Sequence, residues 1–340
     1  MLNRNELSAG PSPAVIRALR RFPSDQLNHY IEGHGSSRLA GVLAKRFGLR
    51  AEQVMLTYGL EDFLRFLFTG LDRRRDVVLT NELHYLYYDQ IATEKGVRIR
   101  TFKLNHGVEE FSFDIDDCLR QLRNVRPRVL ILTSPNNPTG HVIAPEEFRT
   151  IMKAVPTNTL VLLDEAYIGF QRGYDAKFYL RMVKRYPNLG LMRTFSKDYG
   201  LAGLRLGYVL GGRNVRHWLR DVNRDLGLSR LHEALGIAAL RSEKYRAKAV
   251  RHVIARRESF IRAVNALHNF KAFVSETNFV LIAAKNDRIS SALLKATVKM
   301  PVVLTTRYGR YVRVSIGRPA DLAALLRVMQ RLDVQTKSSR

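Results

Sequence analysis

Short apolar runs alternate with helix-like segments along most of this chain, and this alternation constrains its fold more than any other feature. Strands and helices that follow one another in regular order predict parallel strands joined by helical crossovers. The strand-like runs are residues 53–59, 76–82, 97–104, 128–135 and 159–167, and the helix-like runs are residues 35–49, 61–71, 85–96 and a segment from about Pro145.

The pattern becomes more helical near Gly236. Two strand-like runs follow at residues 277–284 and 311–317, and a last helix is expected after Pro319. The chain has 340 residues, of which 46% are hydrophobic, so it can bury a core in one large part and one smaller part. We therefore expect a mainly parallel α/β fold followed by a smaller α/β unit. The first 25 residues are expected to be irregular.

The net charge of +25 raises the question of a nucleic-acid partner. Basic residues are densest in residues 241–262, where Val250, Ile254, Ile261 and Val264 recur at helical spacing. The charges of this segment are therefore predicted to form the solvated face of an amphipathic helix. No recognition motif accompanies them, so nucleic-acid binding rests on charge alone.

The single cysteine, Cys118, excludes an internal disulfide and a thiolate metal cluster, and it fits a reducing cytoplasm. No apolar run approaches the roughly 18 residues that a membrane helix needs. The start of the sequence lacks the apolar core of a signal peptide. The nine histidines show no spacing typical of metal ligands. The sequence therefore predicts a cytoplasmic protein without a membrane span or a metal site.

Three polar segments follow predicted strands, at the place where open parallel sheets bind their ligands. They are SPNNPTG (134–140), LLDEAY (162–167) and RTFSK (193–197). Each alone has a structural interpretation, because Asn-Pro and Thr-Gly form turns, Asp164 could cap a helix and Lys197 could be a solvated turn residue. Their occurrence together favours a site.

These segments, with the opening LNRNELSAGPSP and the longer run RTFSKDYGLAGLRLGY, resemble the fold-type I aminotransferases that use pyridoxal 5′-phosphate. Within them, the chain is similar to the histidinol-phosphate aminotransferase branch, from about Leu2 to about Leu332. The resemblance implies a three-layer α/β/α large domain and a smaller α/β C-terminal domain. The implied parts are an N-terminal segment that packs with the small domain (1–28), the large domain (29–240) and the small domain (241–335).

The resemblance implies that Lys197 forms the Schiff base with the cofactor aldehyde and then moves the proton at the substrate α-carbon. Asp164 matches the carboxylate beside the cofactor's ring nitrogen, whose pKa it raises by charge pairing. Asn137 and Tyr167 match the pair that hydrogen-bonds the ring hydroxyl. The implied reaction is ping-pong transfer of an amino group from a donor to a 2-oxo acid.

The cofactor phosphate needs several hydrogen-bond donors and a cation. By resemblance these are the hydroxyls of Thr194 and Ser196, the guanidinium of Arg205 and the backbone amides of the turn 59–61. The turn consists of Gly59, Leu60 and Glu61, whereas the family often has Gly-Ser-Asp or Gly-Ala-Asp, so Leu60 brings no hydroxyl. Tyr85 aligns with the aromatic residue that stacks on the ring, although core packing of Tyr85 or Tyr88 is the alternative.

Tyr30 matches a tyrosine that reaches the cofactor phosphate of a neighbouring subunit, which implies a homodimer. The following proline of the family segment is lost here, because the chain reads NHYIEG. Arg313 in YVRVSIG matches the arginine that holds the substrate α-carboxylate through a bidentate pair. Arg307 is a candidate for a second acidic group, with a solvated loop arginine as the alternative.

The donor is less well defined. In the histidinol-phosphate branch, a tyrosine just before the GPSP run helps to hold the substrate phosphate, but here that position is Ala9, and Ser8 replaces the usual proline. Loss of a phenol donor weakens phosphate recognition. Histidinol phosphate and aromatic or other specialised amino acids therefore remain candidate donors. A decarboxylase of the threonine-phosphate type is the alternative enzyme, and a non-catalytic nucleic-acid-binding protein is the alternative class.

Overall fold

The structure of the protein is a computed structural model that describes residues 2–31, 37–215, 228–297, 305–308 and 310–335, except for the side chains of residues 305–308 and 335. Within these ranges, a seven-stranded sheet has the order β1-β9-β8-β7-β6-β2-β3. Neighbouring strands from β8 to β3 run parallel, and β9 is antiparallel to both β8 and β1. The strands are β1 (Val54–Thr57), β2 (Val77–Asn81), β3 (Arg98–Phe102), β6 (Val129–Thr133), β7 (Leu160–Asp164), β8 (Leu189–Thr194) and β9 (Gly207–Gly211).

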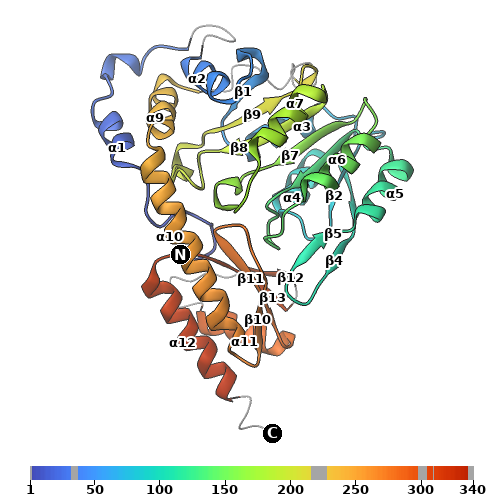
Figure 1. Cartoon of the computed structure of the whole chain (residues 1–340), viewed down its shortest axis with the longest axis vertical. Coiled ribbons are helices and arrows are strands. Elements are labelled where there is room, and N and C mark those ends of the chain that lie inside the picture. Colours follow the sequence, from blue (N-terminus) through green and yellow to red (C-terminus); the bar gives the residue numbers. More distant parts are fainter. Residues whose placement is uncertain (1, 32–36, 216–227, 298–304, 309, 336–340) are drawn as a thin grey trace.

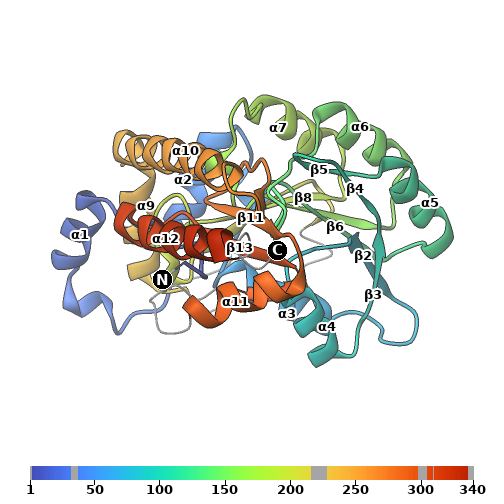
Figure 2. The ribbon, with the colours of Figure 1, turned by 90° about the horizontal axis from the view of Figure 1, so that it is seen from below.

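Helices cover both faces of this sheet (Figures 1 and 2). Successive strand residues point to opposite faces: in β6, Leu130 and Leu132 pack toward α5, α6 and α7, while Val129 and Ile131 pack toward α3 and α4. Both faces are therefore apolar, as expected for a parallel sheet. The predicted three-layer α/β/α class is confirmed. These helices are α3 (Leu60–Thr69), α4 (Tyr87–Lys95), α5 (Ile115–Val125), α6 (Pro145–Ala154) and α7 (Ala176–Arg185).

The C-terminal part contains a second, antiparallel sheet in the order β10-β11-β13-β12. It packs with α10 to α12 around its own apolar core, which also contains Leu2 and Leu7 of the N-terminal segment. The backbone N–H of Ser315 donates to the carbonyl of Leu2 at 2.9 Å. The domain boundaries after residues 28 and 240 stay predictions. The elements are α9 (Arg230–Leu240), α10 (Glu243–Asn265), β10 (Phe270–Ala272), β11 (Phe279–Ala284), α11 (Asp287–Thr297), β12 (Thr305–Tyr308), β13 (Tyr311–Ser315) and α12 (Pro319–Gln335).

The N-terminal region is more regular than expected. Pro13–Arg20 form helix α1, because Ser12 caps its first turn by accepting the N–H of Val15 and Pro13 suits a first helical position. Helix α1 lies against α9. The expectation of an irregular start was therefore wrong for this segment. The remaining elements are η1 (Ser24–Gln26), α2 (Arg38–Phe47), η2 (Ala51–Gln53), the hairpin β4 (Leu104–His106) and β5 (Phe111–Phe113), η3 (Ile168–Phe170) and η4 (Ala202–Leu204).

The basic segment 241–262 forms most of α10, as predicted, but its charges do not all face solvent. Val250 and Val264 are buried and Arg251 and Arg262 are exposed, in agreement with an amphipathic helix. In contrast, Arg257 is fully buried. The expectation that the charges form only a solvated face was wrong, because buried carbonyls and carboxylates of other segments surround part of the helix.

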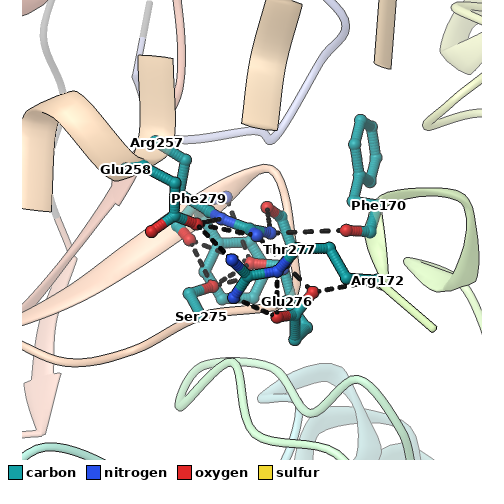
Figure 3. A network of polar contacts seen from close by, with 8 residues as sticks. All are labelled: Phe170, Arg172, Arg257, Glu258, Ser275, Glu276, Thr277 and Phe279. Carbon is teal, nitrogen blue, oxygen red and sulfur yellow. Dashed lines mark hydrogen bonds and ion pairs between the residues drawn. The ribbon is translucent and has the colours of Figure 1, made fainter. Parts of the chain in front are cut away.

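Arg257 joins three segments that lie far apart in the sequence (Figure 3). Its Nη1 donates to the carbonyls of Thr277, at 3.0 Å, and Phe170, at 3.4 Å. Its Nη2 pairs with Glu258 at 3.0 Å and Glu276 at 3.5 Å. Phe170 belongs to η3, directly after β7, and Thr277 precedes β11. The guanidinium thereby fixes α10 against the end of a central strand and the start of the second sheet.

Across the described ranges, no helix combines the length and the apolar character that a bilayer span requires.

Candidate active site

The three polar segments of the sequence meet at one edge of the sheet. They follow the neighbouring strands β6, β7 and β8, in which Thr133 pairs with Asp164 and Asp164 pairs with Met192. Because these strands are parallel, their carboxyl ends lie at the same edge, where such sheets bind ligands. Asn137, Asp164 and Lys197 are brought to this edge from different crossovers, as the sequence predicts.

Asp164, the last residue of β7, is buried and holds two hydrogen bonds. Its Oδ2 accepts the hydroxyl of Tyr88 at 2.7 Å, and its Oδ1 accepts the N–H of Ala166 at 3.0 Å. Burial raises the pKa of the Asp164 carboxyl to about 6, and these two hydrogen bonds oppose that rise. A carboxylate held in this way can pair with a cationic ligand atom near neutral pH.

The residue after Asp164 is held by a buried ion pair. Glu165 accepts the guanidinium Nε of Arg193 at 2.6 Å, and the hydroxyl of Tyr174 also donates to Glu165 at 2.7 Å. Arg193 lies on β8, so the pair ties the ends of neighbouring strands together. Both charges are nearly excluded from solvent, with side chains 1% and 7% exposed. Such a pair is costly to break and fixes the backbone on which Asp164 stands.

Tyr167 is buried beside Asn137. Its hydroxyl lies 3.3 Å from the Nδ2 of Asn137 and 3.0 Å from the Nδ2 of Asn5, and each amide donates to it. A hydroxyl that accepts from two amides still has its own hydrogen to donate. Tyr167 and Asn137 thus form the polar pair that the sequence predicts. Asn5 was missed as a member, although it lies in the opening LNRNE segment.

Lys197 stands in the turn after β8 and is half-buried. Its Nζ donates to the backbone carbonyl of Arg4 at 3.1 Å and lies 5.6 Å from the ring centroid of Tyr167. The interpretation of Lys197 as a merely solvated turn residue is not supported by these contacts. The N-terminal segment passes directly over the amine.

Arg313, on β13, reaches the same place from the second sheet. Its Nη1 donates to the Oδ1 of Asn137 and its Nη2 to the carbonyl of Asn3, both at 2.7 Å. Its Nε is buried and has no hydrogen-bond partner among the described residues. The guanidinium also lies 5.4 Å from the ring centroid of Phe279. A buried, unsatisfied cationic donor is suited to an anionic ligand group.

The residues predicted to bind phosphate gather around the start of α3. Gly59 has a φ of +79°, which favours glycine, and a β-carbon there would lie 2.6 Å from the Nη2 of Arg205, so the guanidinium lies directly against this turn. Arg205 Nη2 lies 3.5 Å from Glu61, which also accepts the hydroxyl of Tyr85 at 2.5 Å. The α3 amino terminus and Arg205 together form a corner that offers backbone N–H groups and a guanidinium, with the Glu61 carboxylate paired to that guanidinium.

Thr194 ends β8 and Ser196 follows it, at the same edge of the sheet as this corner. Thr194 pairs with Gly207 of β9, and Gly207 pairs in turn with Thr57 of β1, two residues before Gly59. The hydroxyl of Thr194 donates to the carbonyl of Leu206 at 3.3 Å and accepts the N–H of Ser196 at 3.0 Å. Thr194 therefore shapes the turn, and its hydroxyl hydrogen is already engaged. Leu60 is half-buried and contributes only its backbone to a polar ligand.

One predicted residue, Tyr30, does not join this cluster within the described part of one chain. Tyr30 is 93% exposed, and among the described residues only its carbonyl is engaged, by Arg230. Arg307 lies in β12, and its side chain is outside the described residues. Ala9 accepts the hydroxyl of Tyr245 on its carbonyl at 2.8 Å. Tyr88 was considered only as a core-packing residue, but its hydrogen bond to Asp164 makes it part of the site.

The fold and the site define a pyridoxal-phosphate enzyme of the aminotransferase type. The family model of aminotransferase class I and II matches residues 1–329, and the chain belongs to this family, whose cofactor is pyridoxal 5′-phosphate. The enzyme transfers an amino group between an amino donor and a 2-oxo acid.

Two curated relatives cover nearly the whole chain. One is a histidinol-phosphate aminotransferase of Staphylococcus epidermidis, 29% identical over 98% of this chain and 91% of its own. Another is an aromatic amino acid aminotransferase of Corynebacterium jeikeium, 31% identical over 97% of this chain and 87% of its own. Among solved structures, histidinol-phosphate aminotransferase from Sinorhizobium meliloti, in complex with pyridoxal-5′-phosphate, superposes with a TM-score of 0.86 at 23% identity, covering 98% and 91% of the two chains.

The residues at the strand ends fit this cofactor. A buried carboxylate at Asp164 suits a protonated ring nitrogen, and the free hydroxyl hydrogen of Tyr167 suits an ionised ring oxygen. The corner formed by Gly59 and Arg205 supplies the donors and the cation that a phosphate needs. Lys197 offers the amine for an aldehyde. The unsatisfied Nε of Arg313 remains available for a substrate anion.

Proposed function

We propose that Lys197 is the amine that binds the cofactor and moves the proton at the substrate α-carbon. The cofactor, when bound, supplies the electron sink that makes that carbon acidic. The contact that supports this role is the position of Nζ, between the Arg4 carbonyl and the face of the Tyr167 ring. Borohydride should fix a pyridoxyl group on the peptide that carries Lys197. A label on another peptide would contradict the assignment.

Asp164, Asn137 and Tyr167 orient the cofactor ring in this proposal. Asp164 keeps the ring nitrogen protonated, and Tyr88 holds its carboxylate in the charged form by donating to it. Tyr167 donates to the ring oxygen, while Asn137 fixes the Tyr167 hydroxyl. The phosphate would be held by Arg205, Ser196 and the backbone of Gly59, Leu60 and Glu61, and Tyr85 would lie against the ring. Thr194 would donate only after releasing the Leu206 carbonyl.

We propose further that the donor carries an α-carboxylate and a bulky, specialised side chain, with aromatic amino acids as the first candidates. The observation that carries this proposal is Arg313, a half-buried guanidinium whose buried Nε is an unused donor beside Asn137. Ala9 offers no side-chain donor for a substrate phosphate, in contrast to a phenol at that position. Arg307 and the side chain of Ala9 would line the outer wall.

Histidinol phosphate is the second candidate, because the relative from Staphylococcus epidermidis, which aligns with 98% of this chain, is a histidinol-phosphate aminotransferase. It has no α-carboxylate, so Arg313 would face the substrate phosphate instead. A screen of amino donors against 2-oxoglutarate, monitored through the cofactor absorbance, distinguishes aromatic donors from histidinol phosphate. A clear preference for histidinol phosphate would overturn the inference from Ala9. Release of carbon dioxide without transfer of the amino group would favour the decarboxylase alternative.

We propose that two copies of the chain form a homodimer and share their sites through Tyr30. Its side chain is 93% exposed, and that of Leu27, three residues earlier, is 66% exposed, so a single chain leaves both apolar surfaces uncovered. Mixing inactive Tyr30→Phe and Lys197→Ala subunits should restore activity, because one site of each heterodimer regains both residues. A monomer by light scattering at micromolar concentration would contradict the proposal. The cytoplasmic location stays a prediction from the single cysteine.

A further inference from the structure

Asp198, the residue directly after Lys197, carries a buried negative charge that the cofactor chemistry does not use. Its side chain is 8% exposed, and its Oδ2 accepts the guanidinium Nη1 of Arg246 at 2.7 Å. Burial raises the pKa of the Asp198 carboxyl, and the positive charge of Arg246 opposes that rise.

The same carboxylate lies against the turn that carries Tyr167. A β-carbon at Gly169, in η3, would collide with the carboxyl group of Asp198, so the two turns touch only because residue 169 is glycine. Asp198 therefore contacts Gly169, two residues after Tyr167, and it follows Lys197 directly in the chain. The lysine turn therefore packs on η3 through this one carboxylate.

Arg246 is anchored independently of Asp198. It also pairs with Glu243, one turn earlier in α10, and Glu243 in turn pairs with Arg46 of α2 at 2.9 Å. The guanidinium of Arg246 lies 5.3 Å from the ring centroid of Tyr199, which is the second residue after the lysine. The arginine thus holds the lysine turn from a long helix that buried Arg257 also fixes, three turns further on.

We infer that Arg246 is a positioning residue, which acts through Asp198 to hold the amine of Lys197 where it can bind the cofactor aldehyde. The inference rests on the proposed role of Lys197. Without Arg246, the Asp198 carboxylate would be buried without its cation and would move toward water or toward another cation. Either movement displaces the turn 197–200, which carries the amine. The effect should fall on the covalent part of cofactor binding.

The test compares two forms of the cofactor on the cofactor-free protein. Pyridoxal 5′-phosphate needs the amine of Lys197 for its covalent bond, whereas pyridoxamine 5′-phosphate has the same ring and phosphate but no aldehyde. Arg246→Gln should weaken binding of the first by about tenfold and leave binding of the second within about twofold of wild type. The double variant Asp198→Asn with Arg246→Gln should regain most of the affinity, because a neutral pair replaces the stranded charge.

Arg251→Gln is the matched control, since it removes the same charge from an exposed position of α10 and should change neither affinity. Equal losses for both cofactor forms, or no loss, in Arg246→Gln would overturn the inference and leave the pair a purely structural one. If that variant does not fold, Arg246→Lys applies the test, because it keeps the positive charge but shortens the reach to Asp198, with the same two outcomes. Lys197→Ala separates the two hypotheses: if it binds pyridoxal 5′-phosphate as tightly as wild type, the proposed function itself fails.

Discussion

The hydroxyl of Tyr88 lies 2.7 Å from Oδ2 of Asp164 and 3.2 Å from Oγ1 of Thr133, so a fully buried tyrosine from α4 joins the ends of β6 and β7. The tyrosine satisfies one carboxylate oxygen, and the backbone N–H of Ala166 satisfies the other. The charged form of Asp164 is thereby stabilised in a place where burial alone would favour the protonated form.

The first prediction concerns this hydrogen bond. Tyr88→Phe removes the donor and leaves a buried carboxylate oxygen without a partner, at a cost of about 1–3 kcal/mol. The pKa of Asp164 should rise further, so affinity for pyridoxal 5′-phosphate should fall more at pH 6 than at pH 8. Titration of the cofactor-free protein with pyridoxal 5′-phosphate, followed by absorbance, measures the affinity at each pH. Tyr87→Phe, at a partly exposed neighbouring position, is the control, and an equal loss at the two pH values would contradict the explanation.

The second prediction concerns the pH dependence of stability. The pKa of Asp164 is raised from 3.8 to about 6, so between these values the folded protein holds the proton and the unfolded chain releases it. The contribution of this group to the free energy of unfolding therefore falls as the pH rises, by about 3 kcal/mol in total. Denaturant unfolding of cofactor-free wild type and Asp164→Asn at pH 4 and pH 7 measures it. The free energy of unfolding of the wild type minus that of the variant should decrease as the pH rises. A constant difference would show that Asp164 is not the group responsible.

The third prediction concerns Arg257, whose guanidinium is buried among Phe170, Glu276 and Thr277 (Figure 3). Arg257→Met leaves two buried carbonyls and part of a carboxylate without their donor. We expect a loss of about 3 kcal/mol in the free energy of unfolding, because removal of one partner from a buried ion pair is strongly destabilising. Urea unfolding of the cofactor-free protein measures the loss. Arg262→Gln, exposed on the same helix, should change stability by less than about 0.5 kcal/mol, and similar losses in both variants would refute the role of the network.

The fourth prediction concerns Arg313 and the donor. A bidentate pair between its guanidinium and a carboxylate contributes roughly 1.5–3 kcal/mol. Arg313→Lys should therefore lower kcat/KM by about tenfold to a hundredfold, and by a similar factor for every donor that bears an α-carboxylate. Steady-state kinetics with several aromatic donors measures the factor, with Arg310→Lys as the control. Losses that differ widely among these donors would show that Arg313 contacts the side chain instead.

Some features of the site could be predicted because they depend on residues close together in the chain. The turns after β6, β7 and β8 carry Asn137, Asp164 and Lys197, and strand-helix periodicity alone brings such turns to one sheet edge. Tyr88, Asn5 and Arg246 were missed or underestimated. Each contacts the site from a distant segment, such as Asn5, which is 162 residues from Tyr167.

The sequence by itself determined the α/β class, the parallel crossovers and the chemical groups at the strand ends, since hydrophobic periodicity and turn composition act over a few neighbouring residues. It did not determine which polar side chains of the helices face inward. The pattern of α10 indicates a solvated basic face, yet Arg257 is fully buried and Arg246 reaches Asp198. Only the tertiary structure decided this, because an arginine is stable inside a protein only where the carbonyls and carboxylates of other segments already surround it.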